Sequence, residues 1–398
     1  MKILVLNCGS SSIKYKLFDM PEKTELSSGG IEKIGLSDSF LKYKTIVGET
    51  KFIYKPIAEH TQGVELILSI LREASGNAIK TFADIDAVGH RVAHGGDRFK
   101  SSTVITQEVV DDIKKCYELA PLHNPANMKG IEAISNILPN VPQVAVFDTA
   151  FHQTMQPHAY MYALPYEYYT KYGVRRYGFH GTSHKFVAQR ACEFLGLNFE
   201  NSRLVTAHIG NGGSVTAIKN GKSVDTSMGL TPVEGLMMGT RCGNVDLGVM
   251  TYLMDKENLT TKQINDIINK QSGLLGVSGI SSDMRDIEKA ISEGNERAKL
   301  ALEMYMHYVL KYIGSYIAVL GGVDAIVFTG GVGENQPILR KYVCEHLNFM
   351  GLDFNDELNE NSYGKEVELS LPNSKIHVAV IPTNEELAIA TDTEELLK

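Results

Sequence analysis

A pattern that occurs twice is the feature that most constrains how this chain can fold. Residues 3–18 combine a short aliphatic segment, a loop of small polar residues and a second strand-like segment, and residues 204–219 repeat that layout. Each copy is typical of two strands joined by a loop that contains glycine. Because the second copy begins about half a chain after the first, we expect two related domains that face each other and present both loop tips to one cleft.

Strand-like and helix-like segments alternate along the chain, which predicts layered α/β domains. The expected strands are residues 3–6, 14–19, 85–88, 143–147, 204–209, 214–218, 325–329 and 376–381. The expected helices are residues 63–74, 183–195 and 296–320, and the last carries Leu300, Met304, Tyr308 and Tyr312 at helical spacing. A length of 398 residues suits two domains. Since no linker rich in proline, serine or charge separates them, we place the cut near residues 148–149.

Composition and charge narrow the class of protein. A hydrophobic fraction of 43% and a charged fraction of 22% exclude a disordered chain. The net charge of −8 and the lack of a basic block predict no nucleic-acid partner. The most apolar stretch, residues 312–332, contains Asp324 and several glycines, so no membrane span is expected. Five cysteines without a C-x-x-C pair predict no disulfide framework, and they suit a reducing compartment such as the cytoplasm.

Three loops of small residues are candidates for binding phosphate. The loop at residues 7–14 offers hydroxyls, turn amides and a lysine, although a polar turn would also explain it. The loop at residues 208–214 has more glycines than a tight hairpin needs, and a flexible bulge is its alternative. The loop at residues 329–335 follows an expected strand and opens an expected helix, an arrangement suited to nucleotides. The three loops together favour a polyphosphate ligand.

Arginine and histidine are concentrated in a few glycine-rich segments. Arg91 and Arg241 can each bind a carboxylate or phosphate with two parallel hydrogen bonds, while helix capping or a salt bridge is the structural alternative. His180 and His184 have the spacing of a zinc pair, but no third ligand is apparent. A histidine that donates to a substrate oxygen is therefore favoured there. His123 is a further candidate between two prolines.

Acidic residues follow two of the expected strands. Asp148 comes directly after residues 143–147, and Glu385 and Glu386 come shortly after residues 376–381. Magnesium in proteins typically takes one or two carboxylates besides water and phosphate oxygens, so these positions are candidates for a Mg²⁺ site. For the two glutamates, the alternative is an acidic first helical turn that the helix dipole stabilises.

Taken in order, these segments resemble the acetate kinase family from residue 3 to about residue 391. The similar segments are Val5-Leu-Asn-Cys-Gly-Ser-Ser-Ser-Ile-Lys14, Gly89-His-Arg-Val-Ala-His-Gly-Gly96, Gly178-Phe-His-Gly-Thr-Ser-His184, Gly210-Asn-Gly-Gly-Ser214, Gly239-Thr-Arg241 and Thr329-Gly-Gly-Val-Gly-Glu-Asn335. The resemblance covers essentially the whole chain.

The resemblance implies an α/β fold with duplicated ribonuclease-H-like domains of the acetate and sugar kinase/heat-shock cognate/actin superfold, and a nucleotide cleft between them. It implies an N-terminal acid- and phosphate-side domain of residues 1–148 plus about 384–398. It also implies a C-terminal nucleotide-binding and dimerisation domain of residues 149–383, and a homodimer. The implied reaction is reversible phosphoryl transfer between ATP and acetate, giving acetyl phosphate and ADP, with Mg²⁺ or alternatively Mn²⁺. Because a carboxylate is already ionised at neutral pH, this reaction needs no general base.

The resemblance also implies roles for individual residues. The implied catalytic residues are Arg91, His123, Asp148, His180 and Arg241. The implied acid-binding residues are Arg91, Ala93, Leu122, Phe179, Pro232 and Arg241. The implied nucleotide-binding residues are Ser10, Ser12, Lys14, His208, Ile209, Gly210, Asn211, Gly212, Asp283, Met284, Arg285, Gly330, Gly331, Val332, Gly333 and Asn335. The implied metal-binding residues are Asn7, Asp148 and Glu385, with Glu385 preferred to Glu386 by the register of the motif.

Two departures from the family pattern bear on function. After Arg241 the family usually has Ser-Gly-Asp-x-Asp-Pro, whereas residues 242–247 here are Cys-Gly-Asn-Val-Asp-Leu. Acetate kinases often have valine where this chain has Ala93, and the similar propionate kinases often have alanine. A propionate kinase or a broad short-chain carboxylate kinase is therefore the alternative. An alternative of another class is a non-catalytic actin-like ATPase, which would not need Arg91, His180 and Arg241 around an acid.

Overall fold

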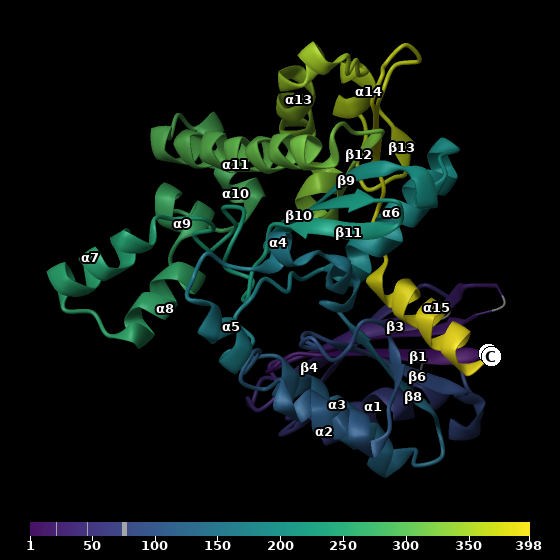
Figure 1. Cartoon of the computed structure of the whole chain (residues 1–398). Helices are drawn as coiled ribbons and strands as arrows, with labels where there is room; N and C mark the ends of the chain where they lie inside the picture. The colour runs from purple at the N-terminus through teal and green to yellow at the C-terminus, as the bar shows by residue number, and fades with distance from the viewer. Residues whose placement is uncertain (21, 46, 74–77) are drawn as a thin grey trace. The chain divides into compact units, whose positions relative to one another are not determined.

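The chain divides into two compact units, each built on one sheet (Figure 1). The structure is a computed structural model that describes residues 1–20, 22–45, 47–73 and 78–398. Unit 1 comprises Met1–Phe151 and Asn384–Lys398, and unit 2 comprises His152–Thr383. The last helix of the chain thus belongs to unit 1, together with the N-terminal residues. No helix among the described residues is long and apolar enough to span a lipid bilayer.

The sheet of unit 1 joins an antiparallel meander to a set of parallel strands. Its order is β5 (Thr50–Tyr54), β4 (Phe40–Lys44), β3 (Thr24–Glu32), β2 (Ile13–Asp19), β1 (Lys2–Cys8), β6 (Ala87–Val92), β8 (Gln143–Phe147) and β7 (Thr103–Val104). Strands β1, β6 and β8 run parallel, and β1 pairs antiparallel with β2. Parallel strands place their carboxyl ends at one edge, where α/β proteins bind ligands.

Alternation along β1 directs apolar side chains to both faces of this sheet. Leu4 and Leu6 pack in the cluster that contains residues of α1 (His60–Glu73) and α3 (Asn124–Ile137), whereas Ile3 and Val5 pack with α15 (Glu385–Leu397). Helices therefore cover both faces of the sheet (Figure 1).

Two details of unit 1 differ from the sequence-based expectations. The strand expected at residues 85–88 begins later, at Ala87, because Phe82–Asp84 form a 3₁₀ turn that ends at Ile85. The helix expected at residues 63–74 is α1, which ends at Glu73, and Ala74 lies outside the described residues.

The sheet of unit 2 repeats the arrangement of unit 1. Its order is β11 (Lys222–Thr226), β10 (Gly213–Lys219), β9 (Arg203–Ile209), β12 (Ala325–Thr329), β14 (His377–Val380) and β13 (Val367–Glu368). Strand β9 pairs antiparallel with β10 and parallel with β12, as β1 does with β2 and β6. The repeated sequence pattern thus corresponds to two hairpins of the same topology, which confirms the predicted duplicated α/β fold.

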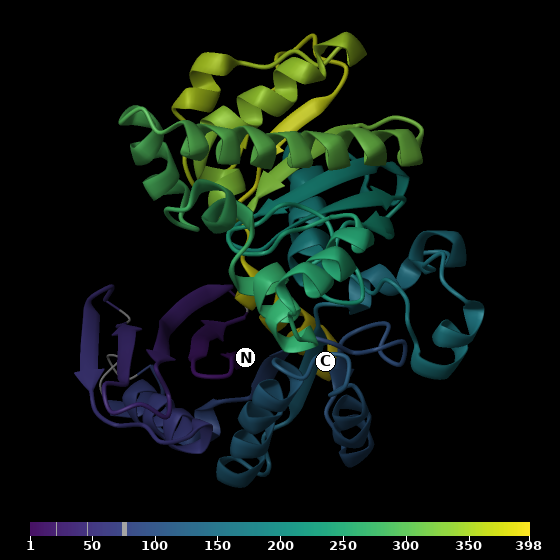
Figure 2. The ribbon, with the colours of Figure 1, turned by 90° about the vertical axis from the view of Figure 1, so that its left-hand side faces the viewer.

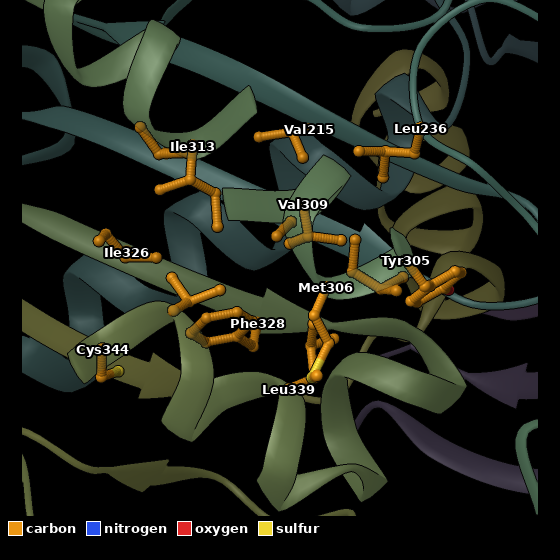
Figure 3. Packing of buried hydrophobic residues seen from close by; sticks show 14 of the residues in the cluster. Val215, Leu236, Tyr305, Met306, Val309, Ile313, Ile326, Phe328, Leu339 and Cys344 are labelled. Atoms are coloured by element: carbon orange, nitrogen blue, oxygen red, sulfur yellow. The ribbon is translucent and has the colours of Figure 1, made fainter. Parts of the chain in front are cut away.

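Helices cover both faces of the second sheet as well. Figures 1 and 2 show α11 (Glu296–Leu320) and α6 (Gly181–Leu195) on opposite faces of this sheet. Alternate residues of β12 divide between these faces. Ile326 and Phe328 belong to the large core beneath α11 (Figure 3), and Val327 packs with α6. The remaining helices are α2 (Gln107–Lys115), α4 (Pro157–Tyr160), α5 (Tyr166–Tyr172), α7 (Leu247–Glu257), α8 (Thr261–Lys270), α9 (Gly273–Ser278), α10 (Met284–Ser292), α12 (Gly330–Asn335), α13 (Pro337–His346) and α14 (Asp356–Glu360).

Helix α11 has the predicted bounds, and its most buried residues are not the four whose spacing indicated the helix. Leu300 is 48% exposed, whereas Tyr305, Val309 and Ile313 are buried in the core (Figure 3). Met304, Tyr308 and Tyr312 are only partly buried. Those four residues, from Leu300 to Tyr312, are each four positions apart. Because a helix has about 3.6 residues per turn, residues at a fixed spacing of four do not stay on one face.

Candidate active site

The carboxyl ends of three parallel strands bring Asn7, Arg91 and Asp148 together in unit 1. Asn7 lies near the end of β1, Arg91 on β6, and Asp148 directly after β8. Arg91 donates from Nε and Nη2 to the two carboxylate oxygens of Asp148, at 3.2 and 2.5 Å, and from Nη1 to Asn7 Oδ1 at 3.2 Å. Because a guanidinium has five N–H groups and these bonds use three, Arg91 keeps donors for an anionic ligand.

Glu385 joins this group from the first turn of α15. Burial and the nearby Asp148 raise its pKa to about 7, against the opposing effect of Arg91. Glu386 instead pairs with Lys16 at 3.3 Å. The two adjacent glutamates therefore have different surroundings.

The donor set of this group fits a hard divalent cation. Asp148, Glu385 and Asn7 offer oxygen atoms, which Mg²⁺ prefers. Arg91 pairs with Asp148, while burial and the nearby charge of Asp148 raise the pKa of Glu385. A cation bound to these oxygens would lower that pKa, because an opposite charge favours the ionised form.

The turn between β1 and β2 places the predicted phosphate-binding residues beside this group. Gly9 N donates to Ser12 O at 2.8 Å, and His60 Nε2 donates to Gly9 O at 2.7 Å, so the turn is braced from α1. Ser10 is exposed and Ser12 is partly exposed. Lys14 lies opposite Asn7 in the β1–β2 register, and its charge lowers the pKa of Glu385. The turn can therefore present hydroxyls and one cation to an anion.

The predicted acid-binding residues of unit 1 are not equally placed to enclose a ligand. Ala93 follows β6, is 3% exposed, and donates from its amide to Asn127 Oδ1 at 3.0 Å. Leu122, by contrast, is 71% exposed, so the structure does not show it as a packed wall. His123 is exposed at the beginning of α3. Within unit 1, Ala93 is thus enclosed by neighbouring residues, while Leu122 and His123 face solvent.

Three histidines lie side by side in unit 2, near the ends of β9 and α6. The rings of His180 and His208 stack at a centroid distance of 4.3 Å. Ser214 Oγ hydrogen-bonds both His180 Nδ1, at 2.9 Å, and His184 Nε2, at 2.7 Å. The other nitrogen of His184 contacts Thr206 Oγ1 at 2.7 Å. Hydroxyl partners on both nitrogens make His184 a structural anchor for His180 rather than a zinc ligand.

His180 itself has an unusual backbone that aims its ring. Its φ is +56°, a left-handed conformation that few residues other than glycine adopt, and it immediately precedes α6. Such strain persists where surrounding contacts determine the conformation, and it clusters at functional sites. The adjacent Phe179 is buried, and its carbonyl accepts a hydrogen bond from His152 Nε2 at 2.9 Å.

Arg241 meets His180 at the glycine-rich tip of the β9–β10 hairpin. A Cβ on Gly212 would lie 3.2 Å from Arg241 Nη1 and 3.9 Å from His180 Nε2. Arg241 donates to the Pro232 carbonyl at 3.3 Å, and burial lowers the pKa of its guanidinium. No carboxylate of unit 2, within the part of the chain that the structure describes, forms an ion pair with Arg241. A half-buried guanidinium without a carboxylate partner, next to the backbone of a glycine-rich turn, is suited to binding an anion.

A cavity of about 560 Å³ lies in unit 2 next to the same hairpin tip. Its volume is in the range of ligand sites. Of the predicted nucleotide-binding residues, those that line it are Gly210, Asn211, Asp283, Met284, Arg285, Gly331, Val332 and Asn335. Four lining residues were not predicted: Leu274, Ser282, Tyr305 and Gln336. Gln336 directly follows the predicted glycine-rich loop, and Leu274 follows Gly273. Ser282 and Tyr305 have no adjacent glycine motif that could have identified them.

Five residues of unit 2 that were predicted to contact the nucleotide do not line this cavity. Ile209, Gly330 and Gly333 are all buried. Gly330 has a φ of +77°, and a Cβ there would lie 2.8 Å from Ile209 O. Its glycine is therefore required by the close packing of α12 on β9 rather than by a ligand. His208 and Gly212 lie outside the cavity lining but at the hairpin tip beside Arg241.

Buried histidines make the stability of the protein dependent on pH. His90 contacts Gln143 Oε1 at 2.8 Å, and burial lowers its pKa to about 4; burial also lowers the pKa of His152 to about 4 and that of His184 well below its usual value. These groups bind protons less readily in the folded than in the unfolded chain. Their contribution to the free energy of unfolding is complete above pH 6.5 and is lost as the pH falls toward 4. Over that range each histidine lowers the free energy of unfolding by about 1.4 kcal/mol per pH unit.

We therefore expect the free energy of unfolding to fall between pH 6.5 and 5, measured by denaturant titration. The substitution His90→Gln should make that slope shallower, and His158→Gln, at an exposed position, should leave it unchanged. A free energy of unfolding that stays constant from pH 7 to pH 5 would contradict this expectation.

Comparison with known proteins identifies the family. A family model described as the acetokinase family matches residues 2–391. The acetate kinase of Parabacteroides distasonis is 58% identical over 397 residues, which cover 100% of this chain and 99% of that protein. The acetate kinase of Bacteroides thetaiotaomicron is 59% identical over 398 residues, which cover both proteins completely.

Solved structures give the same result. The crystal structure of the Porphyromonas gingivalis acetate kinase, 57% identical, matches over 100% of both chains with a TM-score of 0.97. A propionate kinase from Francisella tularensis, 41% identical, matches over 99% of both chains with a TM-score of 0.92. The resemblance found in the motifs is confirmed, and this chain belongs to the acetokinase family.

Proposed function

We propose that this chain catalyses the reversible transfer of a phosphoryl group between ATP and acetate, giving acetyl phosphate and ADP. The observation that carries the proposal is the meeting of Arg241, His180 and the Gly212 backbone beside a nucleotide-sized cavity. Membership of the acetokinase family supports the choice of a carboxyl group as the acceptor. A non-catalytic ATPase would have no use for this arrangement.

In the forward reaction, an acetate oxygen forms a bond to the γ-phosphorus as the bond from that phosphorus to the ADP oxygen breaks. The attacking carboxylate is ionised at neutral pH, so no side chain has to remove a proton. Rate acceleration then comes from aligning the reactants and from stabilising charge on the transferring group.

Arg241 and His180 supply that stabilisation in unit 2. Arg241 places N–H donors beside the hairpin tip, and His180 is held at its Nδ1 by Ser214. These donors are fixed before the reaction begins, which is the condition under which such groups act most strongly. In unit 1, the remaining N–H groups of Arg91 bind the acid, and Asp148 fixes the guanidinium plane.

The metal and the nucleotide are assigned to separate parts of the chain. Asp148, Glu385 and Asn7 hold Mg²⁺, with Mn²⁺ as an alternative, and a bound divalent cation neutralises phosphate charge. The cavity of unit 2 holds the nucleoside, and Gly210, Asn211 and Gly331 offer backbone and amide groups to the phosphates. Unit 1 is thus the acid- and phosphate-side domain and unit 2 the nucleotide domain.

The proposed activity is tested with ATP, Mg²⁺ and hydroxylamine, which converts an acyl phosphate into a coloured hydroxamate. Acetate and propionate are compared at matched concentrations. We expect acetate to give the higher kcat/KM, as the names of the similar proteins suggest. Higher kcat/KM for propionate would support the alternative activity, and the lack of product from either acid would exclude both.

Ala93 is expected to tune the choice of acid. Ala93→Val should raise the ratio of kcat/KM for acetate over propionate by about 10-fold, and Ala93→Gly should lower it, because one methyl group changes the space available to the acid. Steady-state kinetics of both variants check this. Equal ratios in all three proteins would remove Ala93 from the acid-binding residues.

We also propose that the protein is a cytoplasmic homodimer. All five cysteines are free thiols, which supports a reducing compartment. Exposed apolar side chains on α7, among them Leu247 at 76% and Tyr252 at 59%, supply a surface for a second copy. Sedimentation equilibrium at micromolar concentration distinguishes a dimer from a monomer.

A further inference from the structure

A hydrogen-bonded cluster in unit 2 links the segments that carry Arg241 and His180. It consists of Tyr162, Arg176 and Glu234, and we call it the Glu234 clasp. Arg176 Nη2 donates to Glu234 Oε1 at 2.6 Å, and Tyr162 OH donates to Glu234 Oε2 at 2.6 Å. The clasp is mostly buried, since the side chains of Arg176 and Glu234 are 17% and 29% exposed. Burial and Glu234 raise the pKa of Tyr162, so its hydroxyl remains a donor.

The clasp holds the beginning of a long irregular segment, residues 227–246. Arg176 Nη1 donates to the carbonyls of Thr226, at 2.8 Å, and Ser227, at 3.2 Å. Tyr162 OH accepts from the amide of Leu230 at 2.9 Å. The segment contains no helix or strand, so these side-chain bonds replace the backbone ladder that would otherwise determine its course.

The same segment connects the clasp to Arg241. Glu234 lies two residues after Pro232, and the Pro232 carbonyl accepts the hydrogen bond from Arg241 Nη1. Moving Glu234 would therefore move the acceptor that orients the guanidinium. A second connection leads to His180, because the amides of Tyr177 and Gly178 donate to Gly229 O at 3.1 and 3.2 Å. Gly229 packs so closely that a Cβ there would lie 2.2 Å from the Tyr162 hydroxyl oxygen.

We infer that Tyr162, Arg176 and Glu234 are positioning residues that hold Arg241 and His180 in register for the transferring phosphoryl group. A buried ion pair is a weak source of stability but can specify one conformation. Here the pair lies between two loops whose side chains must converge within a few ångströms. The inference rests on the proposed function, since it assigns these residues to the same reaction.

The test uses the full chain with Tyr162→Phe, Glu234→Gln and the double variant. We expect kcat with acetate to fall by about 10- to 100-fold, because donors displaced by a fraction of an ångström lose their alignment. The KM for ATP and the Kd for ADP should change by less than twofold, since the cavity residues lie outside the clasp. The double variant should lose little more than Glu234→Gln alone, as expected for residues that act as one unit. The matched control is Glu366→Gln, which breaks the Arg190–Glu366 pair elsewhere in unit 2.

Hydrogen exchange followed by mass spectrometry gives a readout that is independent of activity. In Tyr162→Phe the Leu230 amide loses its acceptor, so peptides from residues 227–241 should exchange faster than in the parent and the control. Normal kinetics together with unchanged exchange would overturn the inference. If kcat with acetate and the affinity for nucleotide fell equally, or if Glu366→Gln lowered kcat as much as the clasp variants, the clasp would have only a structural role and the inference would be overturned. If Tyr162→Phe exchanged faster but the parent protein made no acyl phosphate, the result would count against the proposed function alone.

Discussion

Replacing Arg241 with alanine is expected to lower kcat/KM for acetate by about 10³-fold or more. Arginines that stabilise a transferring phosphoryl group contribute factors of this size. The side chain has no carboxylate partner within the described residues of unit 2, so its removal leaves no buried charge unpaired there. The folded fraction, measured by circular dichroism, should therefore stay unchanged while activity is lost. Steady-state kinetics with acetate and ATP provide the measurement.

Arg285→Ala is the matched control for this prediction. Arg285 pairs with Asp283 at the cavity, and its side chain is 84% exposed. Its loss should raise the KM for ATP a few-fold and leave kcat nearly unchanged. If Arg241→Ala affected only the KM for ATP, as Arg285→Ala should, Arg241 would belong to nucleotide binding and not to the phosphoryl site.

Replacing Glu385 with glutamine is expected to lower activity at 1 mM Mg²⁺ by about 10²-fold, with partial recovery at higher Mg²⁺. The same change should stabilise the metal-free protein at pH 8. The folded pKa of Glu385 is about 7 and its usual value 4.5, so its stabilising contribution is complete below pH 4.5 and lost as the pH rises through 7. Above that, the ionised carboxylate costs about 3 kcal/mol, which the neutral amide removes.

The adjacent Glu386→Gln separates this effect from a general loss of acidic charge. Glu386 is on the same helical turn and pairs with Lys16, so its removal should change stability by less than about 1 kcal/mol. Its Mg²⁺ dependence should match that of the parent. Thermal unfolding in EDTA at pH 8 and Mg²⁺ titrations of activity compare the two variants. Equal Mg²⁺ dependence in both would reject Glu385 as a metal ligand.

Much of the fold follows from local patterns in the sequence. Strand β12 and helix α11 have the predicted bounds because the strand is a continuous apolar run, and the helix has Asn295 and Gly321 at its ends. The spacing of Leu300, Met304, Tyr308 and Tyr312 indicated a helix but not its most buried face, because that face is determined by packing against β9 and β10 and not by the helix itself. Strand β6 begins later than predicted for a local reason, namely the 3₁₀ turn that precedes it.

The candidate site divides in the same way. Glycine-rich loops and the arginines within them can be recognised from a few neighbouring residues. Arg91, Arg241 and Asn211 were therefore named as candidate site residues from the sequence. Tyr305 and Ser282 reach the cavity of unit 2 only through the packing of α11 and the loop before α10. Glu234 and Tyr162 are 72 residues apart, and nothing near either one indicates their hydrogen bond. Contacts between distant segments thus account for what sequence patterns missed.

Helix α15 has a consequence for how a ribosome makes this protein. All of unit 2 is translated between Phe151 and Asn384, which takes roughly tens of seconds at about 5–20 residues per second. Throughout that interval the face of the first sheet that carries Ile3 and Val5 lacks its helix, and the acidic group lacks Glu385. A nascent first unit therefore exposes an apolar surface that chaperones would shield. The group of Asn7, Arg91 and Asp148 gains Glu385 only when the C-terminal segment leaves the ribosome.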